Sequence, residues 1–171
     1  MLSRLRTWYE RLLELIVIVL MIVLAAEVTV GVIFRTLGHS LAWYDEIASV
    51  LLAWVTYYGA ALAALKRAHI GVPAVVQALP RRFRLPLVLL AEALVFAFFL
   101  LLAWVGWRVM DMLATDFLIS LPEVSSKYTQ SVIPIGAVLF IIAQALNLPE
   151  TLRAARAGHI KHQAEAVEIN Q

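Results

Sequence analysis

Four long apolar runs constrain this chain more than any other feature of its sequence. Each run is close to the roughly 20 residues that a helix needs to cross about 30 Å of hydrocarbon. With 63% hydrophobic and only 15% charged residues, the chain is too apolar for an ordinary soluble domain. The many short alternating strands of a membrane barrel are missing. We therefore predict an all-α integral membrane protein with a membrane domain at 1–149, a cytoplasmic tail at 150–171, and transmembrane helices at about 12–34, 47–65, 86–109 and 131–148.

The distribution of Lys and Arg predicts how these four transmembrane helices are oriented. Basic residues precede the first span, fill the connection between the second and third, and follow the fourth, whereas the other two connections hold only Arg35, Arg108 and Lys127. By the positive-inside rule, both termini are cytoplasmic, and the two connections with few Lys and Arg residues face outward. A basic start followed by an apolar stretch also fits a secretory signal peptide. Because the apolar run continues to Phe34, we predict a span instead.

The basic connection between the second and third spans contains a segment that is too short to cross a membrane. Pro73 suits the first turn of a helix and Pro80 stops it. We predict a short interfacial helix at about 72–79 that rests on the inner membrane surface. The alternative is a plain basic loop. In either case we expect the nearby basic side chains to lie at the lipid headgroups, namely Arg67, His69, Arg81, Arg82 and Arg84.

Several classes of chemistry have no support in the sequence. The absence of cysteine excludes disulfides, thiolate catalysis and Cys-ligated metal sites. The net charge of +2 follows from the topology, so nucleic-acid binding is not indicated. A shared haem between His39 and His69 is implausible because the predicted topology places them at opposite membrane faces. No hydrolase triad, phosphate loop or metal-binding His-Glu motif is present. We predict that this chain is not an enzyme and binds no cofactor.

Polar residues inside the hydrocarbon are expensive and are therefore the first functional candidates. From the helical rise of 1.5 Å per residue, Glu27 lies roughly 6 Å outward of the midplane, whereas Glu92 and Gln144 both lie roughly 7–8 Å inward. We predict a hydrogen bond between Glu92 and Gln144, so that Gln144→Leu and Glu92→Gln destabilise the protein by similar amounts. Glu27 has two open interpretations, a structural or subunit contact and an ion-coupling group. Glu14 is placed near the interface as a surface or helix-pair charge.

The second span begins with two acidic residues and an aromatic stripe. Asp45 and Glu46 occupy its first turn, where exposed amides and the helix dipole favour negative charge. At three- and four-residue intervals, one side of this helix carries Trp43, Glu46, Val50 and Trp54. Such a surface is suited to anchoring a second protein, and small residues beginning at Gly59 would let another helix approach. The alternative is an ordinary interfacial aromatic belt behind an acidic helix start.

These residues resemble a known family, the small membrane subunit (Q subunit) of the tripartite ATP-independent periplasmic (TRAP) transporters. The resemblance covers roughly residues 35–148 and includes the similar spacing of the following motifs: Trp43-Tyr44-Asp45-Glu46, Gly59-Ala60-Ala61, Arg67-Ala68-His69-Ile70, Pro122, Tyr128, and Ile133-Pro134-Ile135-Gly136. The chain departs from the family pattern at Asp45, where Glu is usual, and at Pro73, where an acid is frequent.

The resemblance implies a role that depends on partners. In such systems a periplasmic binding protein captures an organic acid, and a large membrane subunit imports it with sodium by an elevator-like motion. The small subunit adds a non-transporting scaffold in the bacterial inner membrane, and sodium is expected to bind the large subunit. The alternative function is a self-sufficient, proton-coupled multidrug exporter that uses Glu27. An enzyme of the lipid surface ranks third, because no nucleophile or metal constellation is present.

Overall fold

The computed structural model describes residues 2–66 and 80–157, and all long elements in this part are helices. They are α1 (Leu2–Thr36), α2 (Tyr44–Leu65), α4 (Arg81–Met112) and α6 (Val132–Ala157), with a 3-10 turn η1 (Leu113–Thr115) and a short helix α5 (Ser126–Gln130) between the last two. The four long helices have the length and hydropathy needed to cross a membrane. This confirms the prediction of an all-helical chain with four potential spans.

Part of the sequence-based prediction falls outside the described residues. The interfacial helix at 72–79, the cytoplasmic tail beyond residue 157, and the lipid-facing roles of the side chains of Arg67, His69, Arg81 and Arg82 belong to this part. The side chain of Arg84 is described and is partly buried in the first turns of α4.

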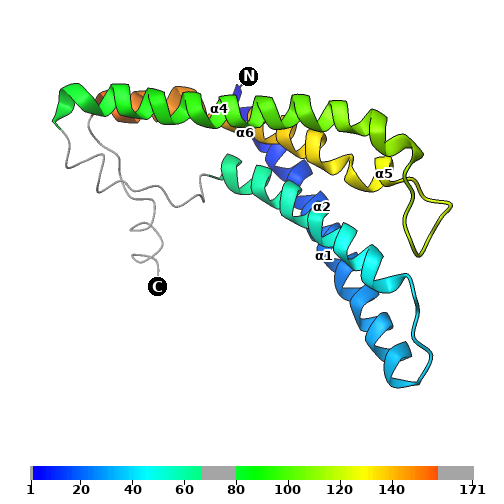
Figure 1. Cartoon of the computed structure of the whole chain (residues 1–171). Coiled ribbons are helices and arrows are strands. Elements are labelled where there is room, and N and C mark those ends of the chain that lie inside the picture. The colour runs from blue at the N-terminus through cyan, green and yellow to red at the C-terminus, as the bar shows by residue number, and fades with distance from the viewer. Residues whose placement is uncertain (1, 67–79, 158–171) are drawn as a thin grey trace, which may run out of the picture.

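The long helices alternate in direction, so the bundle has two ends. We call the end where α2 begins the Asp45 end, which also holds the loops at 37–43 and 113–125. The opposite end, where α2 finishes, is the Lys66 end. Extensive packing joins α1 to α2, α2 to α6, and α6 to α4. Figure 1 shows the consequence, in which the α1–α2 pair crosses the α4–α6 pair at an angle and α6 lies inside while α1 and α4 form the edges.

Helix packing at the Lys66 end uses small residues and a few polar anchors. Ala61, Ala64 and Ala143 are buried there among larger apolar side chains, as expected where helices approach closely in a membrane. The Tyr9 hydroxyl donates to the carbonyl of Leu139 at 2.7 Å, which fixes α1 on α6. The amide of Asn147 donates to the carbonyls of the last two residues of α2, Ala64 and Leu65. Since helix ends leave carbonyls unpaired, Asn147 serves as a side-chain cap from another helix.

Ion pairs reinforce the same end of the bundle. Lys66 binds Glu14 and lies 3.7 Å from Glu10, so Glu14, predicted as a surface or helix-pair charge, pairs with a residue at the end of another helix. The hydrogen bond with Glu14 raises the pKa of Lys66 above its usual value and so favours the charged form of the side chain in this pair. Arg6 pairs with Glu150 at 3.2 Å. This contact holds the last turns of α6 beside α1, and α6 continues through Pro149 to Ala157.

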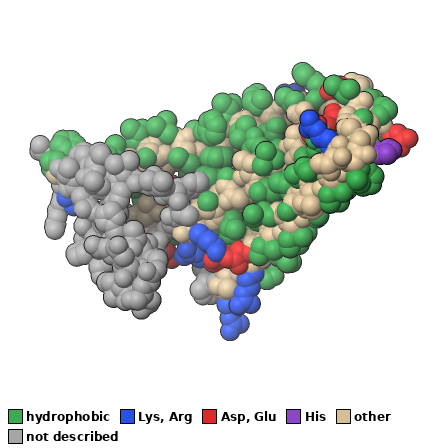
Figure 2. Space-filling view, turned by 90° about the horizontal axis from the view of Figure 1, so that it is seen from below, with side chains coloured by type: hydrophobic (Ala, Val, Ile, Leu, Met, Phe, Trp, Pro, Cys, Tyr) green, Lys and Arg blue, Asp and Glu red, His purple; other side chains and the backbone are tan. Residues whose placement is uncertain are grey.

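Two glycines permit the closest helix contacts. A Cβ on Gly31 of α1 would lie 2.3 Å from Cδ2 of Tyr44, and a Cβ on Gly136 of α6 would lie 2.8 Å from Cβ of Tyr57. In each case an aromatic side chain of α2 occupies the space that a larger residue would need. The surface between the ends is mostly apolar, and Figure 2 shows hydrophobic side chains separating two zones that contain charged groups. This arrangement is typical of a protein that faces lipid.

Candidate functional site

The candidate site lies at the Asp45 end, where Glu46 joins the start of α2 to a loop distant in sequence. Its carboxylate accepts hydrogen bonds from the backbone N–H groups of Ile119 at 3.0 Å and Ser120 at 2.8 Å. The Ser120 hydroxyl donates to the carbonyl of Ala42, just before the helix. Because hydrogen bonds to an ionised acceptor are stronger than neutral ones, Glu46 is the main polar anchor of this loop on α2.

The loop between η1 and α5 has an ordered backbone of its own. Phe117 and Ser125 form an isolated antiparallel bridge, and the Ser125 hydroxyl donates to the carbonyl of Leu113. Ser125 is also the N-cap of α5. The turn between the bridged residues carries Ile119, which is 95% exposed. A β-branched apolar side chain is thus held in the open by two hydrogen bonds to Glu46.

The aromatic stripe on α2 is divided between contacts within the chain and free surface. The indole N–H of Trp54 donates to the carbonyl of Thr129 at 2.8 Å, which attaches α5 to α2. Trp43 and Asp45 are exposed, and Val50 is partly buried. The surface at Gly59 is also open, since a Cβ added there would meet no atom within 4 Å. Contact with a partner stays a prediction for the whole predicted surface, which consists of Trp43, Asp45, Glu46, Val50, Trp54 and Gly59.

Glu27 lies beside the start of α2 and lines a groove of about 370 Å³. Its carboxylate oxygens are both buried, and they have no hydrogen-bond partner among the described residues. The other lining residues, which are mostly apolar, are Val23, Ala26, Val30, Gly31, Leu41, Trp43 and Tyr44. The structure therefore brings together two residues that the sequence analysis treated separately, Glu27 and Trp43.

The other intramembrane polar residues form a separate pair. The Gln144 amide donates to the Glu92 carboxyl at 2.7 Å, which confirms the predicted hydrogen bond between α4 and α6. The rings of Phe99 and Phe140 stack nearby, with centroids 3.7 Å apart. This pair holds two helices together and is distinct from the Glu27 groove. Within the described residues, no group of three or more His, Asp or Glu side chains has the arrangement of a metal site.

Sequence reasoning missed some residues that the site depends on. Nothing in the pattern identified the backbone of Ile119 and Ser120 as the partners of Glu46, because backbone donors carry no sequence signature. The capping role of Ser125 had a detectable signal, since a serine directly before a short polar stretch favours a helix start. The buried amide of Asn147 was also detectable as a polar residue near the end of an apolar run.

Comparison with known proteins agrees with this architecture. The profile of a family described as "Tripartite ATP-independent periplasmic transporters, DctQ component" matches residues 24–154, well over half of the chain. No curated protein matches the sequence. The matched region contains Glu27, the acidic start of α2, the ordered loop and the Glu92–Gln144 pair. The chain therefore belongs to the DctQ family, the small membrane component of the TRAP transporters.

Proposed function

We propose that this chain is a non-transporting scaffold subunit of a sodium-driven TRAP transporter that imports an organic acid into a bacterial cell. Its two termini face the cytoplasm, and its Asp45 end faces the periplasm. A large elevator-type membrane subunit carries the substrate and the sodium ions, and a periplasmic binding protein delivers the substrate. Membership of the DctQ family supports the two partners, and the distribution of Lys and Arg supports the orientation.

The arrangement of the helices is the observation that carries the scaffold role. With α1 and α4 at the edges and only α2 and α6 between them, the described helices pack as a broad layer. A polar substrate crossing a membrane needs a site enclosed between helices and shielded from lipid. A layer of this kind offers two broad faces for lipid or for a larger subunit. The intramembrane polar pair of Glu92 with Gln144 is engaged in joining α4 to α6.

The groove around Glu27 is our proposed seat for the large subunit. A buried carboxylate without a hydrogen-bond donor costs several kcal/mol in hydrocarbon. A partner helix that supplies a donor would remove this cost, which favours its binding at the groove. Trp43 supplies an exposed aromatic wall to the same groove. The proposal requires a rotamer change that turns the buried Glu27 carboxylate into the groove. There it would meet a cationic or hydroxyl side chain from the partner helix.

The loop held by Glu46 is our proposed contact for the binding protein. Its exposed Ile119 projects from the Asp45 end, which faces the periplasm in the proposed orientation. Ile119→Glu should therefore lower binding-protein-dependent uptake while leaving the pairing of the two membrane subunits intact. Loss of membrane-subunit pairing in this variant would contradict the assignment.

Co-purification with the large membrane subunit tests the scaffold role. The variant Trp43→Ala with Trp54→Ala should reduce the yield of the complex, whereas Trp104→Ala with Trp107→Ala is the matched control on α4. Trp54→Phe separates the intrachain bond from the partner contact, because it keeps the ring and loses the N–H donor to Thr129. If the Trp43 and Trp54 variant still co-purified fully with the large subunit, or if only the α4 control lost co-purification, the proposed role of the aromatic stripe as a partner surface would be refuted.

The second candidate function is a proton-coupled exporter of organic cations. The Glu27 carboxylate, which has no hydrogen-bond partner within residues 2–66 and 80–157, favours it, because small exporters rely on a membrane-embedded acid. The purified chain alone in liposomes distinguishes the two functions. An exporter moves a cationic dye such as ethidium against an imposed proton gradient and loses this activity in Glu27→Gln, whereas a scaffold subunit moves none.

A further inference from the structure

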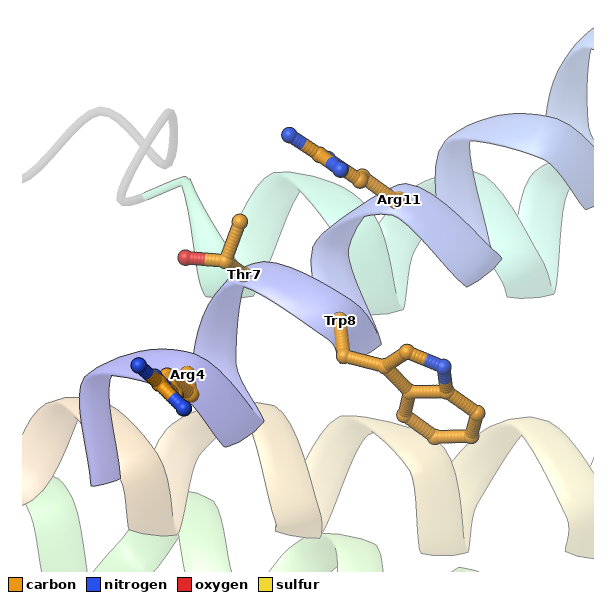
Figure 3. Close-up of a pocket in the computed structure, with 4 residues that line it drawn as sticks. All are labelled: Arg4, Thr7, Trp8 and Arg11. Carbon is orange, nitrogen blue, oxygen red and sulfur yellow. The ribbon is translucent and has the colours of Figure 1, made fainter. Parts of the chain in front are cut away.

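The first turns of α1 carry a basic and aromatic face that the rest of the bundle leaves open. Arg4, Thr7, Trp8 and Arg11 recur at three- and four-residue spacing and line a groove of about 310 Å³. Figure 3 shows all four side chains on the N-terminal part of α1, with the two Arg side chains extending from the helix on either side of Thr7. Arg4, Trp8 and Arg11 are exposed.

Charged residues on the other side of α1 are engaged within the protein. Arg6 pairs with Glu150 of α6, while Glu10 and Glu14 face Lys66 at the end of α2. By contrast, neither Arg4 nor Arg11 forms an ion pair with a described residue. The N-terminal part of α1 therefore has one face committed to the bundle and one cationic face directed away from it.

The cationic face continues into an apolar track along the same side of the helix. From Arg4, Trp8 and Arg11, the alternating spacing of four and three residues leads to Leu15, Ile18 and Ile22, which are 61%, 54% and 63% exposed. The axial distance from Arg11 to Ile22 is about 17 Å, close to half of the roughly 30 Å hydrocarbon thickness. A basic head followed by one leaflet of apolar surface has the dimensions of a membrane lipid.

We propose that this face binds an anionic glycerophospholipid. The guanidinium groups of Arg4 and Arg11 bind its phosphate, the Thr7 hydroxyl lies between them, and Trp8 sits at the glycerol level. One acyl chain follows Leu15, Ile18 and Ile22. Two cations facing a single phosphate favour a headgroup without a positive charge of its own, such as phosphatidylglycerol, over phosphatidylcholine.

Native mass spectrometry of the full chain, delipidated in detergent and titrated with either lipid, tests this site. We expect tighter binding of phosphatidylglycerol than of phosphatidylcholine. In Arg4→Gln with Arg11→Gln, the affinity for phosphatidylglycerol should fall by about 25-fold, or about fivefold for each guanidinium. The affinity for phosphatidylcholine, whose phosphate charge is offset by its choline cation, should fall by less. The matched control, Arg35→Gln with Arg108→Gln, removes the same charge from the Asp45 end and should retain the preference.

Further outcomes separate this site from its alternatives. Ile18→Ser should weaken both lipids, since it interrupts the acyl track, whereas equal binding of soluble glycerol phosphate and of the lipid would overturn the proposal. Equal losses in the two arginine pairs would also overturn it, because they would indicate diffuse electrostatic attraction. If the Arg4 and Arg11 variant kept its lipid binding and lost the large membrane subunit instead, the face would be a protein interface and the proposal would be wrong. Helical content measured by circular dichroism checks that each variant is folded.

Discussion

Replacing Glu46 with Gln should release the ordered loop from the start of α2. The native carboxylate accepts hydrogen bonds from the N–H groups of Ile119 and Ser120 at 3.0 and 2.8 Å. Gln keeps one acceptor oxygen and turns an amide donor toward the other N–H, so one charge-assisted bond is lost and the other is weakened. We therefore expect the loop to open more readily at both amides.

Hydrogen exchange measures this opening at the two donor groups themselves. Exchange at the amides of Ile119 and Ser120 should become faster, by roughly tenfold or more. The matched control is Asp45→Asn, which removes the same charge from the same helix turn and perturbs only the helix-dipole term of about 0.3–1 kcal/mol. Native protection in Glu46→Gln, or an equal loss of protection in Asp45→Asn, would refute the anchoring role of Glu46.

Two further predictions concern helix packing, and thermal unfolding in detergent checks both. Gln144→Leu should destabilise the chain by about 1–3 kcal/mol because it leaves the Glu92 carboxyl without its donor. Replacing both residues with Leu should recover most of the lost stability. An unchanged stability of Gln144→Leu would show that this hydrogen bond does not stabilise the helix packing. Gly31→Ala should cost about 1–3 kcal/mol, since its Cβ would lie 2.3 Å from Tyr44, while Gly59→Ala, in open space, should change stability by less than about 1 kcal/mol. Equal effects of the two alanines would contradict the close contact.

The features that sequence reasoning predicted are those that follow from local physics. Hydropathy alone located four helices that can cross a membrane, because hydrocarbon leaves the backbone few alternatives. Helical rise placed Glu92 and Gln144 at one depth, and the structure joins them by a hydrogen bond. Depth is sufficient for such a prediction because a polar group in the hydrocarbon must find its partner at the same level.

The features that sequence reasoning could not predict depend on which surfaces meet in three dimensions. Glu46 was correctly interpreted as part of a helix start, but its two backbone donors come from a loop more than 70 residues away. Trp54 was assigned to a partner surface, which stays a prediction, and the hydrogen bond from its indole N–H to the carbonyl of Thr129 was not foreseen. Gly31 carried no signal of its own, since only the position of Tyr44 explains why a side chain is excluded there.

The central claim is that this chain supports a transporter and has no pathway of its own. Reconstitution into liposomes with an inward sodium gradient tests it most directly, using the cognate periplasmic binding protein loaded with its organic acid. We predict sodium-driven uptake when this chain and the large membrane subunit are present together, and none above protein-free liposomes when this chain is present alone. Uptake of the acid by this chain in the absence of the large subunit would contradict the account.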